Sequence, residues 1–346
     1  MRKEFKINNE LIKAGESKVV YFSLPALHSN STITMPVHIV HGKKEGPVLF
    51  ISAAIHGDEI NGVEIIRRLL SMDTMKRMRG TLLAVPVVNI YGFNSHSRYL
   101  PDRRDLNRSF PGVGSGSMAG RLANIFLTEV VSRSDIGIDI HTASIHRDNL
   151  PQVRADLNDD KLNIMSKVFE SPVILHSAPP LGSLRAAANQ INVPVMVYES
   201  GEALRFDELS IRVGVRGILN VMNNLGMLTK STQRKQKSSV ILHSSTWVRA
   251  STSGILRATV SLGDMVKKGD LIGYISNPAS KTDTIVEATS SGIIIGRTNI
   301  PLIYEGEALF HIGKSHQTKL LEEHMDALNN DSLLNPPELV EEPVIV

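Results

Sequence analysis

Short apolar runs rich in valine and isoleucine alternate with amphipathic stretches along the first two-thirds of the chain. The runs expected to be strands are 19–24, 32–40, 48–55, 81–89, 135–141, 172–176 and 193–199. The stretches with apolar residues three to four positions apart, expected to be helices, are 62–72, 120–131, 161–169 and 208–225. Continuous apolar runs suit strands that are covered on both faces, and their alternation with helices favours a layered α/β domain. We therefore predict a mostly parallel mixed sheet.

The overall composition is that of an ordinary globular protein. Of the 346 residues, 42% are hydrophobic and 21% are charged, as in ordinary globular proteins. The chain length suggests about two domains. The net charge of +3 does not indicate a nucleic-acid partner. No apolar run reaches the ~18 residues needed to span a membrane, and the N-terminus lacks the apolar segment of a secretory signal. We therefore expect a cytoplasmic protein without a membrane partner.

The chain has no cysteine, so any metal ion must be bound by histidine and carboxylate side chains. His56 and Glu59, in the sequence His-Gly-Asp-Glu, follow the run 48–55 and precede a helical stretch. Open α/β sheets place their sites at such strand ends. Three positions apart on a first helical turn, the imidazole and the carboxylate could bind one metal ion. The alternative is a polar helix start, in which the acidic side chain interacts with the helix dipole.

A second histidine, His141, ends the run 135–141. At the end of a central strand it can point into the same crevice as His56. Two histidines and one glutamate are a common catalytic zinc set that leaves one position open for water. The alternative is a histidine that caps its strand through a hydrogen bond.

Two further segments carry charged side chains that suit a site. Segment 98–112 has four arginines within eleven residues, together with proline and glycine, which indicates a loop. Arginine side chains bind planar carboxylates well, although Asp102 and Asp105 could pair with them inside a solvated loop. Glu199 ends the run 193–199. Beside a metal it could act as a general base, and otherwise it is an acid in a turn.

A basic segment without apolar side chains, 229–239, marks a change in composition. We interpret it as a solvated linker rather than a phosphate-binding patch. The expected division is therefore a catalytic domain at 1–228, the linker, a β-rich domain at 240–314, and a C-terminal segment at 315–346. The last segment is expected to hold an amphipathic helix at 315–330 and an acidic tail.

The β-rich segment contains a weak internal repeat. Residues 253–275 and 291–312 both begin with Ser-Gly-Ile, and Gly269-Asp270 in the first matches Gly306-Glu307 in the second. Two similar half-units predict a small barrel or a flattened sandwich with pseudo-twofold symmetry.

Four segments together resemble the succinylglutamate desuccinylase/aspartoacylase family, whose members are relatives of the zinc carboxypeptidases. They are His56-Gly-Asp-Glu59, Arg98 to Arg108, Asp139-Ile-His141-Thr142 and Glu199-Ser-Gly201, and they match that family in order and approximate spacing. The specific motifs cover about 45–205, and a looser likeness extends to 313. The resemblance implies a sheet of the zinc-carboxypeptidase type followed by an accessory β-domain.

The resemblance also implies roles for individual residues and one zinc ion per chain. These are the zinc ligands His56, Glu59 and His141, the carbonyl-polarising Arg98, the general base Glu199, the carboxylate-binding Asn107 and Arg108, a further carboxylate-binding Arg185, and Tyr304 from the β-domain. For Tyr304, a tyrosine at the rim of the β-domain is the alternative. The C-terminal pattern is also similar to biotinyl and lipoyl domains, but Lys281 lies between Ser280 and Thr282 rather than in a carrier motif. We therefore expect a structural β-domain.

The function expected from these observations is that of a zinc-dependent amidohydrolase. It would act on linear amides other than peptide bonds and remove the acyl group from a small N-acyl amino acid. A homo-oligomer is compatible with the sequence. Two alternatives remain open: a zinc carboxypeptidase that acts on a peptide, and a non-catalytic binding or carrier protein that uses its β-domain.

Overall fold

The computed structural model describes residues 2–228 and 238–314. Within these residues a thirteen-stranded sheet has the order β12-β19-β17-β8-β10-β7-β5-β6-β4-β3, and β9, β11 and β14 pair beside this path. Its strands are β3 (Ser17–Leu24), β4 (Ile33–His41), β5 (Lys44–Ala53), β6 (Arg79–Val85), β7 (Ile136–Ala143), β8 (Arg147–Ala155), β9 (Val173–His176), β10 (Val195–Glu202), β11 (Val240–Leu242), β12 (Ser245–Arg249), β14 (Met265–Val266), β17 (Gly292–Thr298) and β19 (Ala308–Gly313). A small hairpin of β1 (Phe5–Ile7) and β2 (Glu10–Ile12) precedes it.

The predicted mixed α/β sheet is confirmed, but among its described strands only two groups are parallel, so it is less parallel than expected. Strands β6, β5, β7 and β10 run parallel to one another, as do β8, β9 and β11. The other pairs, including β10 with β8 and β8 with β17, are antiparallel. The parallel strands are those separated by helices in the sequence, because a crossover connection returns the chain to the same end of the sheet.

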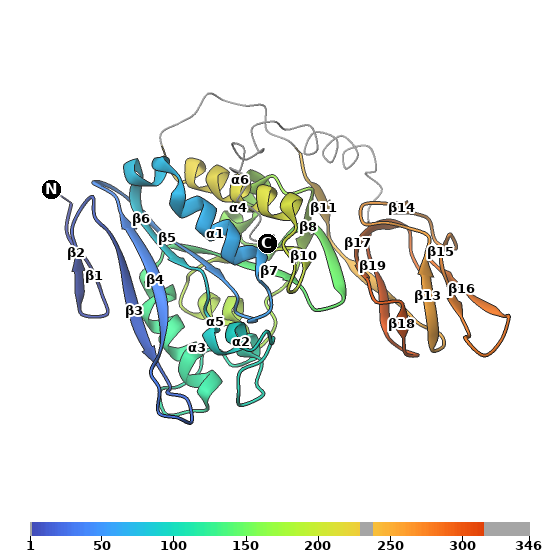
Figure 1. Ribbon diagram of the computed structural model, residues 1–346. Helices are drawn as coiled ribbons and strands as arrows, with labels where there is room; N and C mark the ends of the chain where they lie inside the picture. Colours follow the sequence, from blue (N-terminus) through green and yellow to red (C-terminus); the bar gives the residue numbers. More distant parts are fainter. Residues whose placement is uncertain (1, 229–237, 315–346) are drawn as a thin grey trace, which may run out of the picture.

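Helices cover both faces of the sheet (Figure 1). They are α1 (Asn61–Ser71), α2 (Ile90–Asn94), α3 (Met118–Glu129), α4 (Asp160–Phe169), α5 (Leu184–Gln190) and α6 (Glu208–Asn224), with short 3-10 turns η1 (Asp73–Arg77), η2 (Leu106–Arg108) and η3 (Val131–Arg133). Fully buried Ile65, Phe169 and Ile218 join α1, α4 and α6 in one core. Phe126 and Leu184 of α3 and α5 belong to a second core. No helix of the described part is long and apolar enough to cross a membrane.

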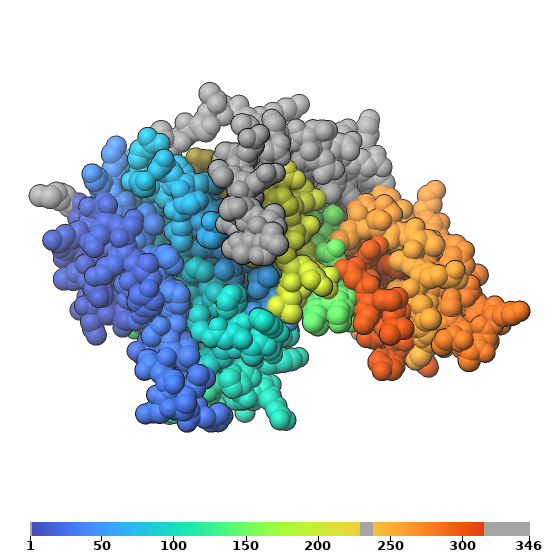
Figure 2. Space-filling model, in the orientation of Figure 1, coloured from blue at the N-terminus to red at the C-terminus, as the bar shows by residue number. Residues whose placement is uncertain are grey.

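The strands at the C-terminal end form a region with its own core but continue the large sheet. A four-stranded sheet is formed by β16 (Asp283–Glu287), β15 (Leu271–Ser276), β13 (Gly254–Ala258) and β18 (Leu302–Ile303). Its apolar side chains pack with those of β12, β17 and β19 in one hydrophobic core. Because β17 pairs with β8, this region (orange to red) lies directly against the β7–β8 segment (green) in Figure 2.

The two halves of the internal repeat make equivalent strand pairs. In the first half β13 pairs with β15, and in the second β17 pairs with β19. Each half also lends a short strand to the other, because β18 pairs with β13 and β14 with β17. The matched turns are alike, since the Asp270 carboxylate accepts the Lys267 N–H and the Glu307 carboxylate accepts the Tyr304 N–H. The expected helix and tail at 315–346 lie outside the described residues, as does most of the 229–239 linker.

The seam between β8 and β17 holds a carboxyl group with a perturbed pKa. Burial, reinforced by the negative charges of Asp207 and Glu202, raises the pKa of Asp148 to about 6, although Arg297 opposes the shift. In the unfolded chain this carboxyl loses its proton near pH 4. The folded state therefore binds the extra proton between these values, and the stability contributed by Asp148 falls as pH rises from about 4 to above 6.

We predict that Asp148→Asn stabilises the protein at about pH 7.5, because the amide has no charge to desolvate. The midpoint of thermal unfolding should rise by roughly 2–4 °C for each kcal/mol recovered. At about pH 4, where the wild-type carboxyl is also neutral in the folded protein, the two midpoints should coincide. An equal difference at both pH values would contradict this account.

Candidate active site

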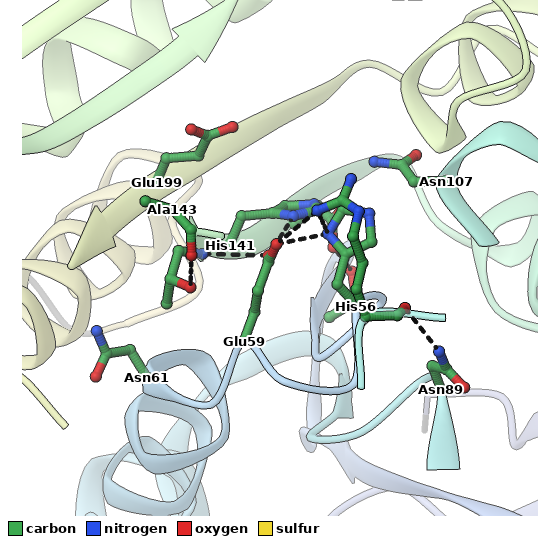
Figure 3. Close-up of polar contacts among 12 residues, drawn as sticks. His56, Glu59, Asn61, Asn89, Asn107, His141, Ala143 and Glu199 are labelled. Atoms are coloured by element: carbon green, nitrogen blue, oxygen red, sulfur yellow. Dashed lines mark hydrogen bonds and ion pairs between the residues drawn. The ribbon is translucent and has the colours of Figure 1, made fainter. Parts of the chain in front are cut away.

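The carboxylate of Glu59 lies between two imidazoles at the carboxyl ends of β5 and β7. His56 Nδ1 is 2.7 Å from Glu59 Oε1, and His141 Nδ1 is 2.7 Å from Glu59 Oε2. All three side chains are buried, and their potential ligand atoms lie within 4.8 Å of one another (Figure 3). Imidazole nitrogens and a carboxylate oxygen that converge in this way fit a tetrahedral metal such as zinc.

Parallel pairing brings these residues together. β5 pairs with β7, so the segment that follows Ala53 emerges beside Ile140, next to His141. Glycine is required at position 57, because a Cβ atom there would lie 2.0 Å from the backbone carbon of Gly92. The glycine of the His-Gly-Asp-Glu motif therefore allows the chain to turn tightly against α2 and place Glu59 between the two imidazoles.

Each imidazole is also held from its far side by an aspartate. His141 Nε2 lies 2.7 Å from Asp139 Oδ2, and the hydroxyl of Ser52 donates to Asp139 Oδ1 at 2.7 Å. His56 Nε2 lies 3.2 Å from Asp105 Oδ1. Carboxylates in this arrangement orient metal-binding histidines and fix their tautomers. Sequence reasoning gave Asp139 and Asp105 no such role, although both stand in the motifs it singled out.

Opposite charges dominate the electrostatics of this group. Burial alone would raise the pKa of the Glu59 carboxyl, but the charges and hydrogen bonds of His56 and His141 hold that pKa below its usual range. Burial likewise works against protonation of His141, yet Asp139 and Glu59 raise the pKa of its imidazole well above the ordinary value. The surroundings of these side chains thus favour a positive charge between them, which is what a metal ion supplies.

The structure places Arg98 in contact with the His–Glu–His group, and Asn107 and Arg108 in the wall of the same cavity. Arg98 Nη1 is 3.2 Å from Glu59 Oε1, and its Nη2 donates to Asp105 Oδ2 at 2.9 Å. Asn107 Oδ1 accepts the Leu184 N–H at the start of α5, so the amide nitrogen of Asn107 is its free end. Arg108 donates to the backbone oxygen of Asn107, and both residues line the cavity that holds the His–Glu–His group.

A cavity of about 290 Å³ opens onto this group. Its wall includes five arginines and two glutamates: Arg98, Arg108, Arg147, Arg154, Arg185, Glu59 and Glu199. Glu199 Oε2 accepts hydrogen bonds from Asn149 Nδ2 at 3.0 Å and forms an ion pair with Arg154 Nη2 at 2.7 Å. The cavity therefore has an excess of positive charge.

The C-terminal strands contribute Trp247, rather than the expected Tyr304, to this cavity. Trp247 of β12 stacks on His311 with ring centroids 4.3 Å apart, and the guanidinium carbon of Arg147 lies 5.5 Å from the indole centroid. Tyr304 is 77% exposed and is not among the lining residues. Lys281 is exposed in the loop between β15 and β16. Nothing in the sequence marked Trp247 as a cavity residue. Long-range strand pairing decides which strand of the β-rich region faces the cavity.

Comparison with known proteins gives a consistent result. The model of the succinylglutamate desuccinylase/aspartoacylase catalytic domain matches residues 45–225. The chain is 25% identical to N-alpha-acetyl-L-2,4-diaminobutyric acid deacetylase from Halomonas elongata over 293 residues, which cover 80% of this chain and 85% of that protein.

Solved structures share the fold. The product-bound ectoine utilization protein from Ruegeria pomeroyi has a TM-score of 0.81 and 22% identity, covering 91% of this chain and 100% of that one. A succinylglutamate desuccinylase/aspartoacylase from Rhodobacter sphaeroides has a TM-score of 0.77 and 23% identity, covering 87% and 96%.

We predict that the purified chain binds one divalent ion through the His–Glu–His group. Elemental analysis should find the metal content sharply reduced in both His56→Ala and His141→Ala. Asp139→Ala, which removes an orienting carboxylate, should weaken metal affinity roughly 10–100-fold. The exposed His28→Ala serves as a control and should keep full occupancy. Unchanged metal content in both ligand variants would refute the assignment.

Proposed function

Because the chain belongs to the succinylglutamate desuccinylase/aspartoacylase family, we propose that it is a zinc-dependent hydrolase that cleaves the amide bond of a small N-acyl amino acid. The observation that carries the proposal is the buried His56–Glu59–His141 group in the wall of a cavity that also contains Arg98 and Glu199. Two imidazoles and one carboxylate are a typical catalytic zinc set.

The reaction needs a nucleophile, an oxyanion partner and a proton carrier. A zinc ion held by the three side chains would supply Lewis acidity and lower the pKa of water toward about 7. Glu199 takes a proton from the attacking water and delivers it to the amide nitrogen as the carbon–nitrogen bond breaks, which yields a carboxylate and an amine. Arg98 donates to the carbonyl oxygen as negative charge develops there, a contribution of roughly 3–4 kcal/mol for a well-placed donor.

Asn107 and Arg108 are proposed to hold the carboxylate of the amino-acid part. The amide oxygen of Asn107 is already bonded to the Leu184 N–H, which leaves its amino group to donate. Arg108 is exposed at the cavity edge and can offer its remaining N–H groups to the same carboxylate. Together they would fix the substrate with its amide bond toward Arg98.

Arg185 supports a substrate that carries a further negative charge. Burial lowers the pKa of its guanidinium, and within the described residues its hydrogen bonds go to neutral oxygens of Ser177 and Ala178. None of these hydrogen bonds goes to a carboxylate, although three carboxylates attract the guanidinium from a distance, those of Glu199, Asp139 and Asp156. An anionic substrate group in direct contact would compensate the cost of burying this cation. We therefore propose that substrates with an added carboxylate are preferred over those with an added amine.

The cavity size favours a small substrate over a peptide. A volume of about 290 Å³ lies just below the roughly 300–1,000 Å³ typical of small-molecule sites. A binding protein without activity would have no need for Glu199 and Arg98 in the same cavity as a metal site. The carboxypeptidase and the non-catalytic alternatives are therefore less well supported.

We further propose that the sheet is of the zinc-carboxypeptidase type and that the chain has a catalytic domain at 1–228 and a β-rich domain at 240–314. We also propose a cytoplasmic location and a homo-oligomeric state. The pairing of β17 with β8 adds that the second domain would share a sheet with the first.

We predict that Glu199→Gln separates proton transfer from metal binding. The variant keeps its metal and its substrate affinity but loses at least about 10²-fold in kcat, because an amide cannot accept the water proton. Trp247, the only tryptophan, lies in the cavity wall, so its fluorescence reports substrate binding. Glu59→Gln should instead lose metal, and excess metal should restore part of its activity. Near-full turnover by metal-loaded Glu199→Gln would exclude the proposed base.

A hydrolysis screen of N-acetyl and N-succinyl amino acids with the metal-loaded enzyme tests the substrate class. We expect kcat/KM to be at least about tenfold higher for glutamate derivatives than for diaminobutyrate derivatives, which corresponds to about 1.4 kcal/mol. Arg185→Gln should reduce this ratio, whereas Arg121→Gln, on the exposed side of α3, should not. Equal rates for both derivatives would contradict the proposed preference.

A further inference from the structure

The carboxylate of Glu199 is anchored through one oxygen only. Asn149 Nδ2 donates to Oε2 at 3.0 Å, and Arg154 Nη2 lies 2.7 Å from the same oxygen. Among the described residues these contacts leave Oε1 as the oxygen that can take a proton. Asn149 is 7% exposed, so its amide is packed rather than free to rotate in solvent.

Asn149 occupies one position in a row of residues that crosses the sheet. Trp247 pairs with His311, His311 with Gly296, and Gly296 with Asn149. On its other side Asn149 pairs with Gly201, beside the bulge that follows Glu199 in β10. The row therefore leads from the C-terminal strands β12, β19 and β17 through β8 to the strand that carries the proposed base.

The lack of a side chain at position 296 makes room for this arrangement. A Cβ atom there would lie 2.7 Å from Asn149 Oδ1 and 3.3 Å from His311 Cβ. The first distance is too short for a carbon–oxygen contact, and His311 is held by its stack on Trp247 and by Ser245 Oγ at 2.8 Å from its Nε2. Any side chain at this position would therefore displace the Asn149 amide.

We propose that Asn149 is a positioning residue for Glu199 and that β17 of the C-terminal region sets its orientation through Gly296. The inference rests on the proposed role of Glu199 as general base. Arg154 supplies the charge that balances the carboxylate, and Asn149 supplies a second donor that fixes the plane of the carboxylate. The C-terminal strands thus take part in catalysis without touching the reacting atoms.

A double-mutant cycle with the metal-loaded full-length chain tests the proposal. Gly296→Ala and Asn149→Ala should each lower kcat by about tenfold, since small misplacements of catalytic groups cost one to two orders of magnitude. KM should stay within about twofold and metal content should not change. The double variant should match Asn149→Ala alone, because no amide is left to displace.

Gly120→Ala is the matched control. It adds the same methyl group at another buried glycine, in α3, where the nearest contact would be an ordinary 3.4 Å to Ser117 Oγ. Its kcat should equal that of the wild type.

Four results would overturn the inference: unchanged kcat in Gly296→Ala, unchanged kcat in Asn149→Ala, a loss of about 100-fold in the double variant, or a parallel loss of metal in Gly296→Ala. The additive result would mean that Gly296 acts through strand packing rather than through Asn149. A wrong assignment of Glu199 as the general base gives another result, because Glu199→Gln would then retain turnover. If Glu199→Gln is inactive while Asn149→Ala is fully active, only the positioning role is refuted.

Discussion

The parallel pairing of β7 with β5 on one side and β10 on the other is the constraint on which the site depends. It brings the carboxyl ends of three strands to one edge of the sheet, where His56 follows β5, His141 ends β7 and Glu199 stands in β10. The parts of these strands that lead to the site are buried on both faces. Hydrophobic packing therefore fixes the positions of the strand ends that carry the polar side chains. The rigidity of the site is therefore a property of the sheet.

The group at that edge concentrates charge in a buried place. Glu59, two imidazoles, Asp139 and Asp105 would be costly to bury singly, but each has an opposite or hydrogen-bonding partner within 3.2 Å. The partners are arranged in two layers, with Glu59 between the imidazoles and the aspartates behind them. Such an arrangement orients ligands before a metal arrives, which reduces the reorganisation needed on binding.

The sequence predicted the central strands from their apolar runs and missed β8, whose polar residues include members of the cavity wall. The runs at 48–55 and 135–141 correspond to β5 and β7, because their valine and isoleucine content reflects burial alone. Strand β8 was not predicted, since Asn149, Gln152 and Arg154 interrupt its apolar pattern, and Asn149 and Arg154 border the cavity. The same reasoning placed His56, Glu59 and His141 in one crevice, because strand ends could be compared without knowing the register. Trp247 could not be found in this way, since its position depends on the pairing of β12 with β19 and of β17 with β8.

The ladder between β17 and β8 also limits how the molecule can move. Many two-part enzymes close over a substrate by a hinge between their lobes, which requires an interface that can slide or open. Here backbone hydrogen bonds join the two parts at residues 147–149 and 296–298, so opening such a hinge would break main-chain pairs. Trp247 and the His–Glu–His group consequently belong to one rigid frame. A substrate would therefore enter a cavity whose walls are already joined, past the exposed Arg108 in its lining.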